Sequence, residues 1–176
     1  LSRTDQIITA ITDTGAAIDV RQALLDEKRH VRVFQKTDTD WNSRGAYIGY
    51  RTIIEALRLQ VPAIPPAKPE SDFDAVTRKI HGMDLAGMMG LTRVLGEEDL
   101  RFAPKATRQY VVVEPKGNIV EAGEAKIVTE IPGSTLPRAV VFRDSFTSAM
   151  APYFSEHFSR VVYLWRNDFA FEEVEK

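Results

Sequence analysis

The segment at residues 140–150, Val-Val-Phe-Arg-Asp-Ser-Phe-Thr-Ser-Ala-Met, constrains the fold more than any other part of the chain. Its apolar start predicts a short buried strand at residues 139–142, followed by a sharp turn and a helix from Ser145 to residue 158. A helix N-terminus presents backbone N–H groups without intrahelical partners and the positive end of the helix dipole. A hydroxyl at Ser145 is therefore well placed for nucleophilic attack beside a stabilised oxyanion.

The rest of the chain alternates between helical and strand-like patterns. Apolar residues at helical spacing predict helices at residues 4–12, 21–30, 43–57 and 84–91, and Ser43 is expected to cap the third. Strands are predicted at residues 16–20, 31–34 and 160–165, and a β-hairpin at residues 110–120. This order predicts an α/β fold in which a mostly parallel sheet is flanked by helices, with the small β-hairpin as an insertion.

Composition limits the classes of function. The 176 residues, 44% of them hydrophobic, are enough for one domain, which we expect to span residues 1–176 and to be part of a longer protein. A net charge of −2 without a basic run gives no reason to expect a nucleic-acid partner. The absence of cysteine excludes disulfides, thiol catalysis and cysteine-type zinc sites.

Two groups of polar side chains follow predicted strands. Asp38 and Asp40 come shortly after the strand at residues 31–34, and Asp144 and Ser145 follow the strand at residues 139–142. Ligands of open α/β sheets bind at the carboxyl ends of the strands. We therefore expect the Asp38–Asp40 segment and Ser145 to share one site, within about one water molecule of each other.

Three motifs resemble the SGNH-hydrolase-like domain of the alginate O-acetylation proteins AlgJ and AlgX and their DHHW relatives. A Thr-Asp-Thr-His-Trp-Asn block of that family is similar to Thr37-Asp-Thr-Asp-Trp-Asn42, followed here by Gly45-Ala-Tyr47. A Gly-Asp-Leu-Ala block is similar to Gly82-Met-Asp-Leu-Ala86, and an apolar strand before Asp-Ser-Phe is similar to Val140-Val-Phe-Arg-Asp-Ser-Phe146. The three motifs occur in the family's order and with its spacing, and the resemblance covers most of the chain.

The resemblance implies an SGNH-hydrolase-like fold and a Ser-His-Asp triad that transfers or hydrolyses acetyl esters of extracellular polysaccharide. Ser145 would be the nucleophile, Asp38 would orient the histidine, and Asp40 occupies the histidine's position. Trp41, Asp144 and His81 are candidates for contact with the substrate. The implied partners are a polysaccharide such as alginate, an acyl donor and other exopolysaccharide modification or export proteins, in an extracytoplasmic location. We expect no cofactor and no metal ion.

An aspartate at position 40 weakens this chemistry. A carboxylate with a pKa near 4 is a weaker base than imidazole by about 2.5 units, which is about 3 kcal/mol for holding the serine's proton. Repulsion between nearby carboxylates would raise one pKa toward the useful range. His157 is twelve residues along the predicted helix and His30 is at the far end of a strand, so His81 is the one candidate for a replacement base.

Other interpretations of the same residues stay open. Ser145 could be only a helix cap, Asp38 and Asp40 only turn formers, and Trp41 only a core residue. Asp38-Thr-Asp40 could instead bind Mg²⁺ or Mn²⁺, as the Asp-x-Asp motif of nucleotide-sugar glycosyltransferases does. A relative that has lost catalysis and binds carbohydrate or acts as a scaffold is the main alternative to a serine-dependent acyltransferase or esterase.

Overall fold

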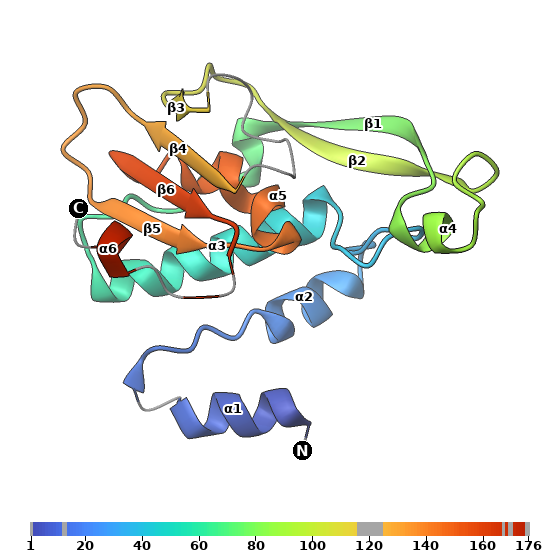
Figure 1. Cartoon of the computed structure of the whole chain (residues 1–176), viewed down its shortest axis with the longest axis horizontal. Helices are drawn as coiled ribbons and strands as arrows, with labels where there is room; N and C mark the ends of the chain where they lie inside the picture. The colour runs from blue at the N-terminus through green and yellow to red at the C-terminus, as the bar shows by residue number, and fades with distance from the viewer. Residues whose placement is uncertain (1, 12–13, 116–124, 167, 169–170, 175–176) are drawn as a thin grey trace.

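The computed structural model describes residues 2–11, 14–115, 125–166, 168 and 171–174 (Figure 1). Its helices are α1 (Arg3–Ile11), α2 (Arg21–Lys28), α3 (Ser43–Gln60), α4 (Asp84–Met88), α5 (Ser145–Phe154) and α6 (Phe171–Val174), with a 3-10 turn at Glu70–Asp72. Its strands are β1 (Phe73–His81), β2 (Gly96–Pro104), β3 (Val111–Glu114), β4 (Lys126–Glu130), β5 (Arg138–Phe142) and β6 (Arg160–Leu164). Within the described residues, no helix has both the length and the apolar character of a membrane span.

A four-stranded sheet in the order β3-β4-β6-β5 forms the centre of the α/β fold. The β5-α5-β6 unit is a crossover, so β5 pairs with β6 in parallel, from Arg138 opposite Arg160 to Phe142 opposite Leu164. The β3–β4 and β4–β6 pairs are antiparallel. The α/β class is therefore confirmed, but the prediction of a mostly parallel sheet is wrong, because only one strand pair is joined through a helix.

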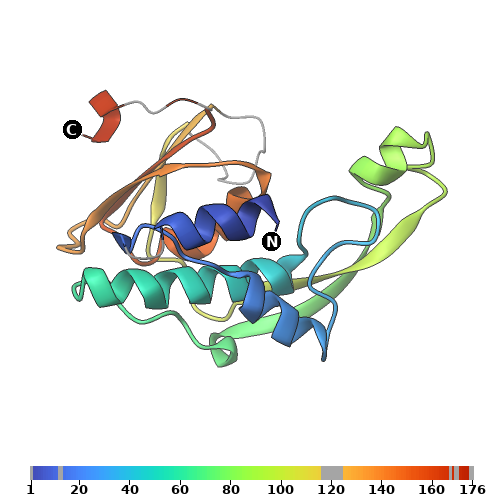
Figure 2. The same cartoon turned by 90° about the horizontal axis from the view of Figure 1, so that it is seen from below.

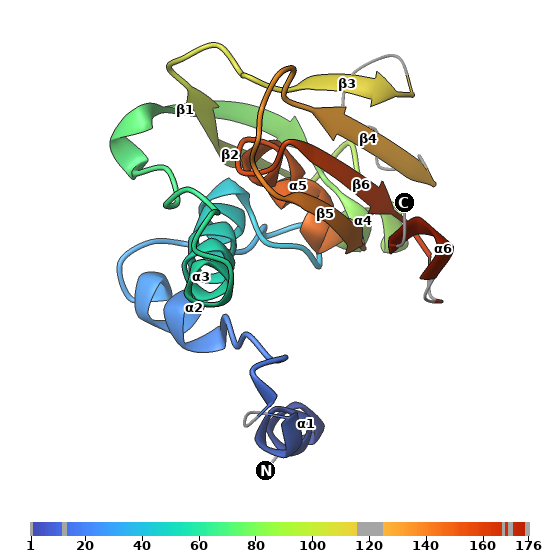
Figure 3. The ribbon, with the colours of Figure 1, turned by 90° about the vertical axis from the view of Figure 1, so that its left-hand side faces the viewer.

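Helices α3 and α5 pack together against one face of this sheet (Figure 3). Their contact buries Tyr47, Tyr50 and Ile54 of α3 completely, together with Val161 and Tyr163 of β6. Apolar side chains at helical spacing on α3 drive this burial, because they form one continuous stripe. The carboxyl end of β5 and the N-termini of α3 and α5 are thereby fixed relative to one another.

The strands β1 and β2 form a long antiparallel ribbon that projects from the body and carries α4 at its tip (Figures 1 and 2). The sequence did not predict this ribbon. Most side chains of β1 are exposed, and β2 buries Glu97 and Asp99 along with Phe102. A ribbon with solvent on much of both faces has no alternation of apolar and polar residues by which a strand is recognised.

Two predicted strands do not form. Residues 16–20 lack regular structure, and residues 31–34 contribute only an isolated bridge between Phe34 and Trp41. The carbonyl oxygen of Val33 accepts a hydrogen bond from the N–H of Asn42, at 3.0 Å, so the chain turns back on itself instead of joining a sheet. In the predicted hairpin at residues 110–120, β3 is confirmed, but the second half lies outside the described residues.

The helices predicted at residues 4–12, 21–30, 43–57 and 84–91 correspond to α1, α2, α3 and α4. Asn42, not Ser43, caps α3, because its Oδ1 accepts the N–H of Gly45 at 3.0 Å. Helix α5 ends at Phe154, four residues before its predicted end.

His157 lies in the turn after α5 and is buried. Its Nδ1 lies 3.2 Å from the carbonyl oxygen of Pro65, which can only accept, so Nδ1 carries the proton. The Tyr50 hydroxyl then donates to Nε2 at 2.6 Å and accepts the N–H of Lys68 at 2.7 Å. Burial lowers the pKa of His157 to about 4. This network attaches the segment at residues 65–68 to α3 and to the turn after α5.

Tyr50→Phe is expected to destabilise the protein by about 1–3 kcal/mol, because it leaves His157 Nε2 and the N–H of Lys68 buried without partners. Urea denaturation followed by circular dichroism measures the loss. Tyr153→Phe is the matched control, since that hydroxyl forms no hydrogen bond within the described part of the chain. Equal stability of the Tyr50→Phe variant and the unsubstituted protein would contradict the proposed network.

Candidate active site

Ser145 is held at the junction of β5 and α5. The N–H of Arg143 donates to the carbonyl oxygen of Leu164 at 2.8 Å, which extends the parallel pairing to the end of β5. Asp144 caps α5, because its Oδ1 accepts the N–H of Thr147 at 3.0 Å. Ser145 is consequently the first residue of the helix, as the sequence predicted, while Asp144 rather than Ser145 is the cap.

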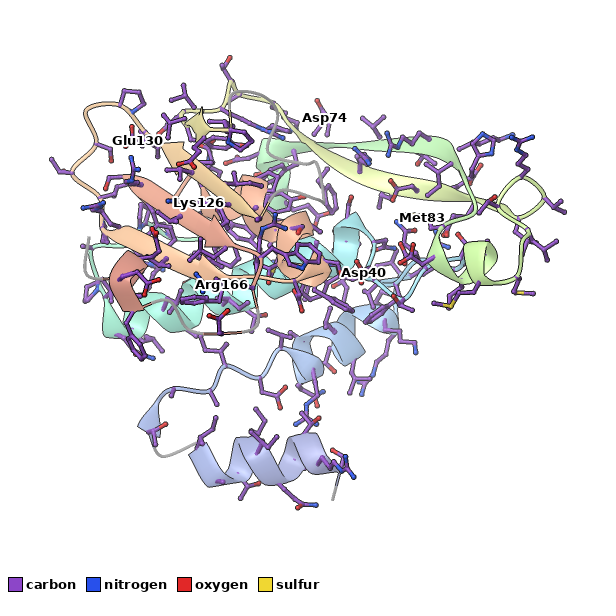
Figure 4. All side chains as sticks on the ribbon, in the orientation of Figure 1. Asp40, Asp74, Met83, Lys126, Glu130 and Arg166 are labelled. Atoms are coloured by element: carbon purple, nitrogen blue, oxygen red, sulfur yellow. The ribbon has the colours of Figure 1, made fainter. Side chains whose placement is uncertain are left out.

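Asp38 and Asp40 lie on the loop at residues 34–41, which precedes α3. Asp40 is labelled in Figure 4. The loop is closed at its base by the N–H of Gln35, which donates to the carbonyl oxygen of Asp40 at 3.1 Å. Its close approach to α3 depends on Gly45 and Gly49. A Cβ at Gly45 would clash with the carbonyl oxygen of Val33, and a Cβ at Gly49 would lie 2.9 Å from the Trp41 ring.

The two segments meet at one hydrogen bond. Ser145 Oγ donates to Asp40 Oδ1 at 3.1 Å, although the two residues are 105 positions apart in the chain. Both side chains are half-buried. The expectation that Ser145 and the Asp38–Asp40 segment share one site is confirmed, and the hydroxyl points its proton at a carboxylate oxygen, as it would toward a general base.

The surroundings of Asp40 raise the pKa of its carboxyl above the ordinary value. Burial is the largest cause, and the negative charges of Asp38, Asp144 and Asp84 act in the same direction, while the hydrogen bond from Ser145 opposes them. The raised pKa makes Asp40 a stronger base than an exposed aspartate. The sequence suggested repulsion by a neighbouring carboxylate but did not identify Asp84, which reaches the site from the tip of the β1–β2 ribbon.

Asp38 uses its side chain locally, because Oδ1 accepts the N–H of Thr39 at 2.7 Å. This is the turn-forming arrangement that the sequence allowed. An orienting role, as implied by the resemblance, would require an imidazole at position 40, so it stays a prediction.

None of the histidines replaces the missing imidazole in the described structure. His81, at the end of β1, is exposed and lines a cavity with Arg32 and Lys36. Within the described part of the chain, it forms no hydrogen bond or ion pair with Ser145 or Asp40. His157 is engaged with Tyr50, and His30 is exposed beyond α2. Asp40 is therefore the one basic group in hydrogen-bond contact with Ser145 among the described residues.

Trp41 is a core residue with 8% of its surface exposed. Its Nε1 donates to the carbonyl oxygen of Phe146 at 3.0 Å, and its ring meets the Phe146 ring edge to face. This contact ties the Asp40 loop to the first turn of α5. Substrate contact by Trp41, Asp144 and His81 stays a prediction. Asn42 uses its side chain to cap α3 and to donate to the carbonyl oxygen of Arg32.

A cavity of about 490 Å³ is lined by Trp41, by Ser148, Ala149 and Pro152 of α5, and by residues of the β1–β2 ribbon such as Phe102, while Ser145 and Asp40 are not among its lining residues. These α5 residues lie three, four and seven positions after Ser145, so they share its face of the helix. The lining of the cavity on α5 therefore begins about one helical turn after Ser145, and the cavity is large enough for a sugar unit.

No group of three or more His, Cys, Asp or Glu side chains suited to a metal ion occurs among the residues that the structure describes. Millimolar Mg²⁺ or Mn²⁺ is accordingly expected to leave the melting temperature unchanged, because binding to the folded state alone would raise it. Differential scanning fluorimetry measures this. A clear rise that Asp40→Asn abolishes would favour the Asp-x-Asp metal interpretation instead.

The chain is similar to one described family. The model of the SGNH hydrolase-like domain, acetyltransferase AlgX, matches residues 1–128, which include Asp38 and Asp40 and end before Ser145. No curated protein matches the chain.

The solved structures that are similar in fold include the following two. A DHHW family protein from Eubacterium siraeum is 15% identical to this chain, with a TM-score of 0.66. The match spans 90% of this chain and 59% of the Eubacterium siraeum protein. Bacillus cereus PatB1 with a sulfonyl adduct is 18% identical to this chain, with a TM-score of 0.67. The match spans 90% of this chain and 62% of PatB1. The chain thus spans about three fifths of the length of these relatives.

Proposed function

Because this chain belongs to the family of the SGNH hydrolase-like domain of the acetyltransferase AlgX, we propose that it is a polysaccharide O-acetyltransferase or esterase-like domain with Ser145 as its nucleophile. The family that the three motifs predicted is confirmed by this match. The observation that carries the proposal is the 3.1 Å hydrogen bond from Ser145 Oγ to Asp40 Oδ1 at the N-terminus of α5.

In the proposed reaction, Ser145 Oγ attacks the carbonyl carbon of an acetyl ester while Asp40 accepts the hydroxyl proton. The carbonyl oxygen becomes an oxyanion near the N-terminus of α5, where backbone N–H groups and the helix dipole stabilise negative charge. Expulsion of the leaving group, which takes the proton from Asp40, leaves an acetyl ester on Ser145. A sugar hydroxyl or water then attacks this ester, gives its proton to Asp40, and Ser145 is regenerated as the proton returns to it.

Asp40 limits the rate in this proposal. The pKa of Asp40 is raised, but the ordinary pKa of an aspartate lies about 2.5 units below that of the imidazole that the family motif has at this position. We propose that activity is impaired for this reason. The cavity, whose lining on α5 begins about one helical turn after Ser145, would hold the acceptor sugar.

The partners and location follow from the family as proposals. The acceptor would be an extracellular polysaccharide of the alginate type and the donor an activated acetyl group. Other proteins of exopolysaccharide modification or export would act with it outside the cytoplasm. The relatives are longer than this chain, so the activity of a whole protein that contains it is also a proposal.

The test is acetyl transfer from 4-nitrophenyl acetate to alginate oligosaccharides, with the product detected by mass spectrometry. We expect slow transfer or hydrolysis that Ser145→Ala abolishes. The rate should rise as the pH increases through the pKa of Asp40, because only the deprotonated carboxylate accepts the serine's proton; since that pKa is raised, the rise should lie above the ordinary aspartate range. Activity that survives Ser145→Ala would show that another residue is the nucleophile.

A non-catalytic carbohydrate-binding relative is the second candidate, favoured by the aspartate at position 40. It predicts that alginate oligosaccharides bind with the same affinity to the unsubstituted chain and to Ser145→Ala, while neither form turns over acetyl esters. Isothermal titration calorimetry together with the transfer assay separates the two candidates.

A further inference from the structure

Glu97 of β2 is a buried carboxylate that the sequence did not single out. Its side chain has 0% exposure and forms an ion pair with Arg32 Nη1 at 2.6 Å. It also accepts the backbone N–H groups of Lys36 and Thr37, each at 2.9 Å, and the Thr37 hydroxyl at 2.7 Å. All these donors belong to the segment that leads into Asp38 and Asp40.

Thr37 also forms hydrogen bonds with the start of α4. Its hydroxyl oxygen accepts the N–H of Met83 at 3.2 Å, and its carbonyl oxygen accepts the N–H of Leu85 at 3.0 Å. Asp84, whose charge helps to raise the pKa of Asp40, lies between those two residues. A single buried carboxylate thus connects the loop that carries Asp40 with the segment that carries Asp84.

Asp99 supports the same loop from the same face of β2. Its Oδ1 accepts Gln35 Nε2 at 2.9 Å, two positions along the strand from Glu97. Burial by itself would raise the pKa of Glu97, but hydrogen bonds from Lys36 and Thr37 and the charge of Arg32 outweigh it, and the pKa is lowered. The carboxylate therefore remains ionised and keeps accepting from the loop.

We infer that Glu97 is a positioning residue that holds the loop at residues 34–41 so that Asp40 stays within hydrogen-bond distance of Ser145. Glu97 acts through the backbone of Lys36 and Thr37 and does not touch the reacting atoms. The effect of Glu97 on the reaction rate rests on the proposed function. Its effect on the position of the loop does not depend on that function. Loss of the charge would leave the loop's N–H groups without a strong acceptor and would let Asp40 move away from Ser145.

The experiment compares Glu97→Gln with Glu98→Gln, a neighbouring and exposed glutamate on the same strand. Amide hydrogen exchange is followed at Lys36 and Thr37 and, as an internal reference, at Ile54 within α3. We expect exchange at Lys36 and Thr37 to accelerate at least 10-fold in Glu97→Gln, with Ile54 and the Glu98→Gln variant unchanged. For 4-nitrophenyl acetate hydrolysis, kcat should fall about 10-fold while KM changes less than 2-fold.

Thr37→Val is the second variant, because it removes one donor to Glu97, together with the acceptor of the Met83 N–H, and keeps the shape of the side chain. It should also accelerate amide exchange at Lys36, but by a smaller factor than Glu97→Gln does. Unchanged exchange at Lys36 and Thr37 in a folded Glu97→Gln variant would overturn the inference, as would an equal effect of Glu98→Gln or global unfolding of both the Glu97 and Thr37 variants. If no form hydrolyses the ester, the proposed function fails, while the exchange result still decides the role of Glu97.

Discussion

Asp40→His is expected to raise the Ser145-dependent hydrolysis of 4-nitrophenyl acetate about 100-fold near neutral pH. Imidazole has a pKa near 6.5 and contributes about 10²–10⁴-fold as a general base. The negative charges of Asp38, Asp144 and Asp84, which raise the pKa of Asp40, would also stabilise the imidazolium that forms when the introduced imidazole takes the serine's proton. Initial rates with purified protein measure the gain.

Ser145→Ala in the Asp40→His background is the control and should remove the whole gain. Asp38→Asn in the same background tests whether Asp38 orients the imidazole, and it should remove most of it. A folded Asp40→His variant with no gain would contradict the proposed triad. The non-catalytic carbohydrate-binding candidate would then be the better account of this chain.

Trp41→Ala is expected to lower the free energy of unfolding by about 3–5 kcal/mol, the usual cost of removing a buried Trp side chain. Trp41 connects the Asp40 loop with α5 through its hydrogen bond to Phe146 and its ring contact with the same residue. Urea denaturation measures the loss. Trp165→Ala is the matched control, because Trp165 is 39% exposed and its removal should cost less than half as much. Equal losses would show that Trp41 is not part of the core.

The sequence predicted the meeting of Ser145 and Asp40, but one of its two reasons was wrong. The apolar run before Asp144 correctly predicted β5 and the start of α5. The strand predicted at residues 31–34, whose carboxyl end was expected to carry Asp38 and Asp40, does not form. The loop before α3 is fixed by hydrogen bonds between its own residues and by β2, not by a sheet partner.

Other parts of the site could not be predicted in this way. Glu97 and Asp99 lie in a polar ribbon without an apolar pattern, and they become buried only when the loop at residues 34–41 packs against β2. Asp84 belongs to a motif that was recognised in the sequence, but only the folded structure shows that its charge raises the pKa of Asp40. The burial of His157 arises similarly, from its contact with Tyr50 of a distant helix.

Covalent labelling of Ser145 tests the central claim most directly. Phenylmethylsulfonyl fluoride reacts with an activated serine as Oγ displaces fluoride from sulfur, and peptide mass spectrometry locates the adduct. The proposed site predicts a single adduct on Ser145, formed at least 10 times faster in Asp40→His than in the unsubstituted chain. An adduct on another residue, or an unlabelled Ser145 in a folded Asp40→His variant, would contradict the assignment of Ser145 as the nucleophile.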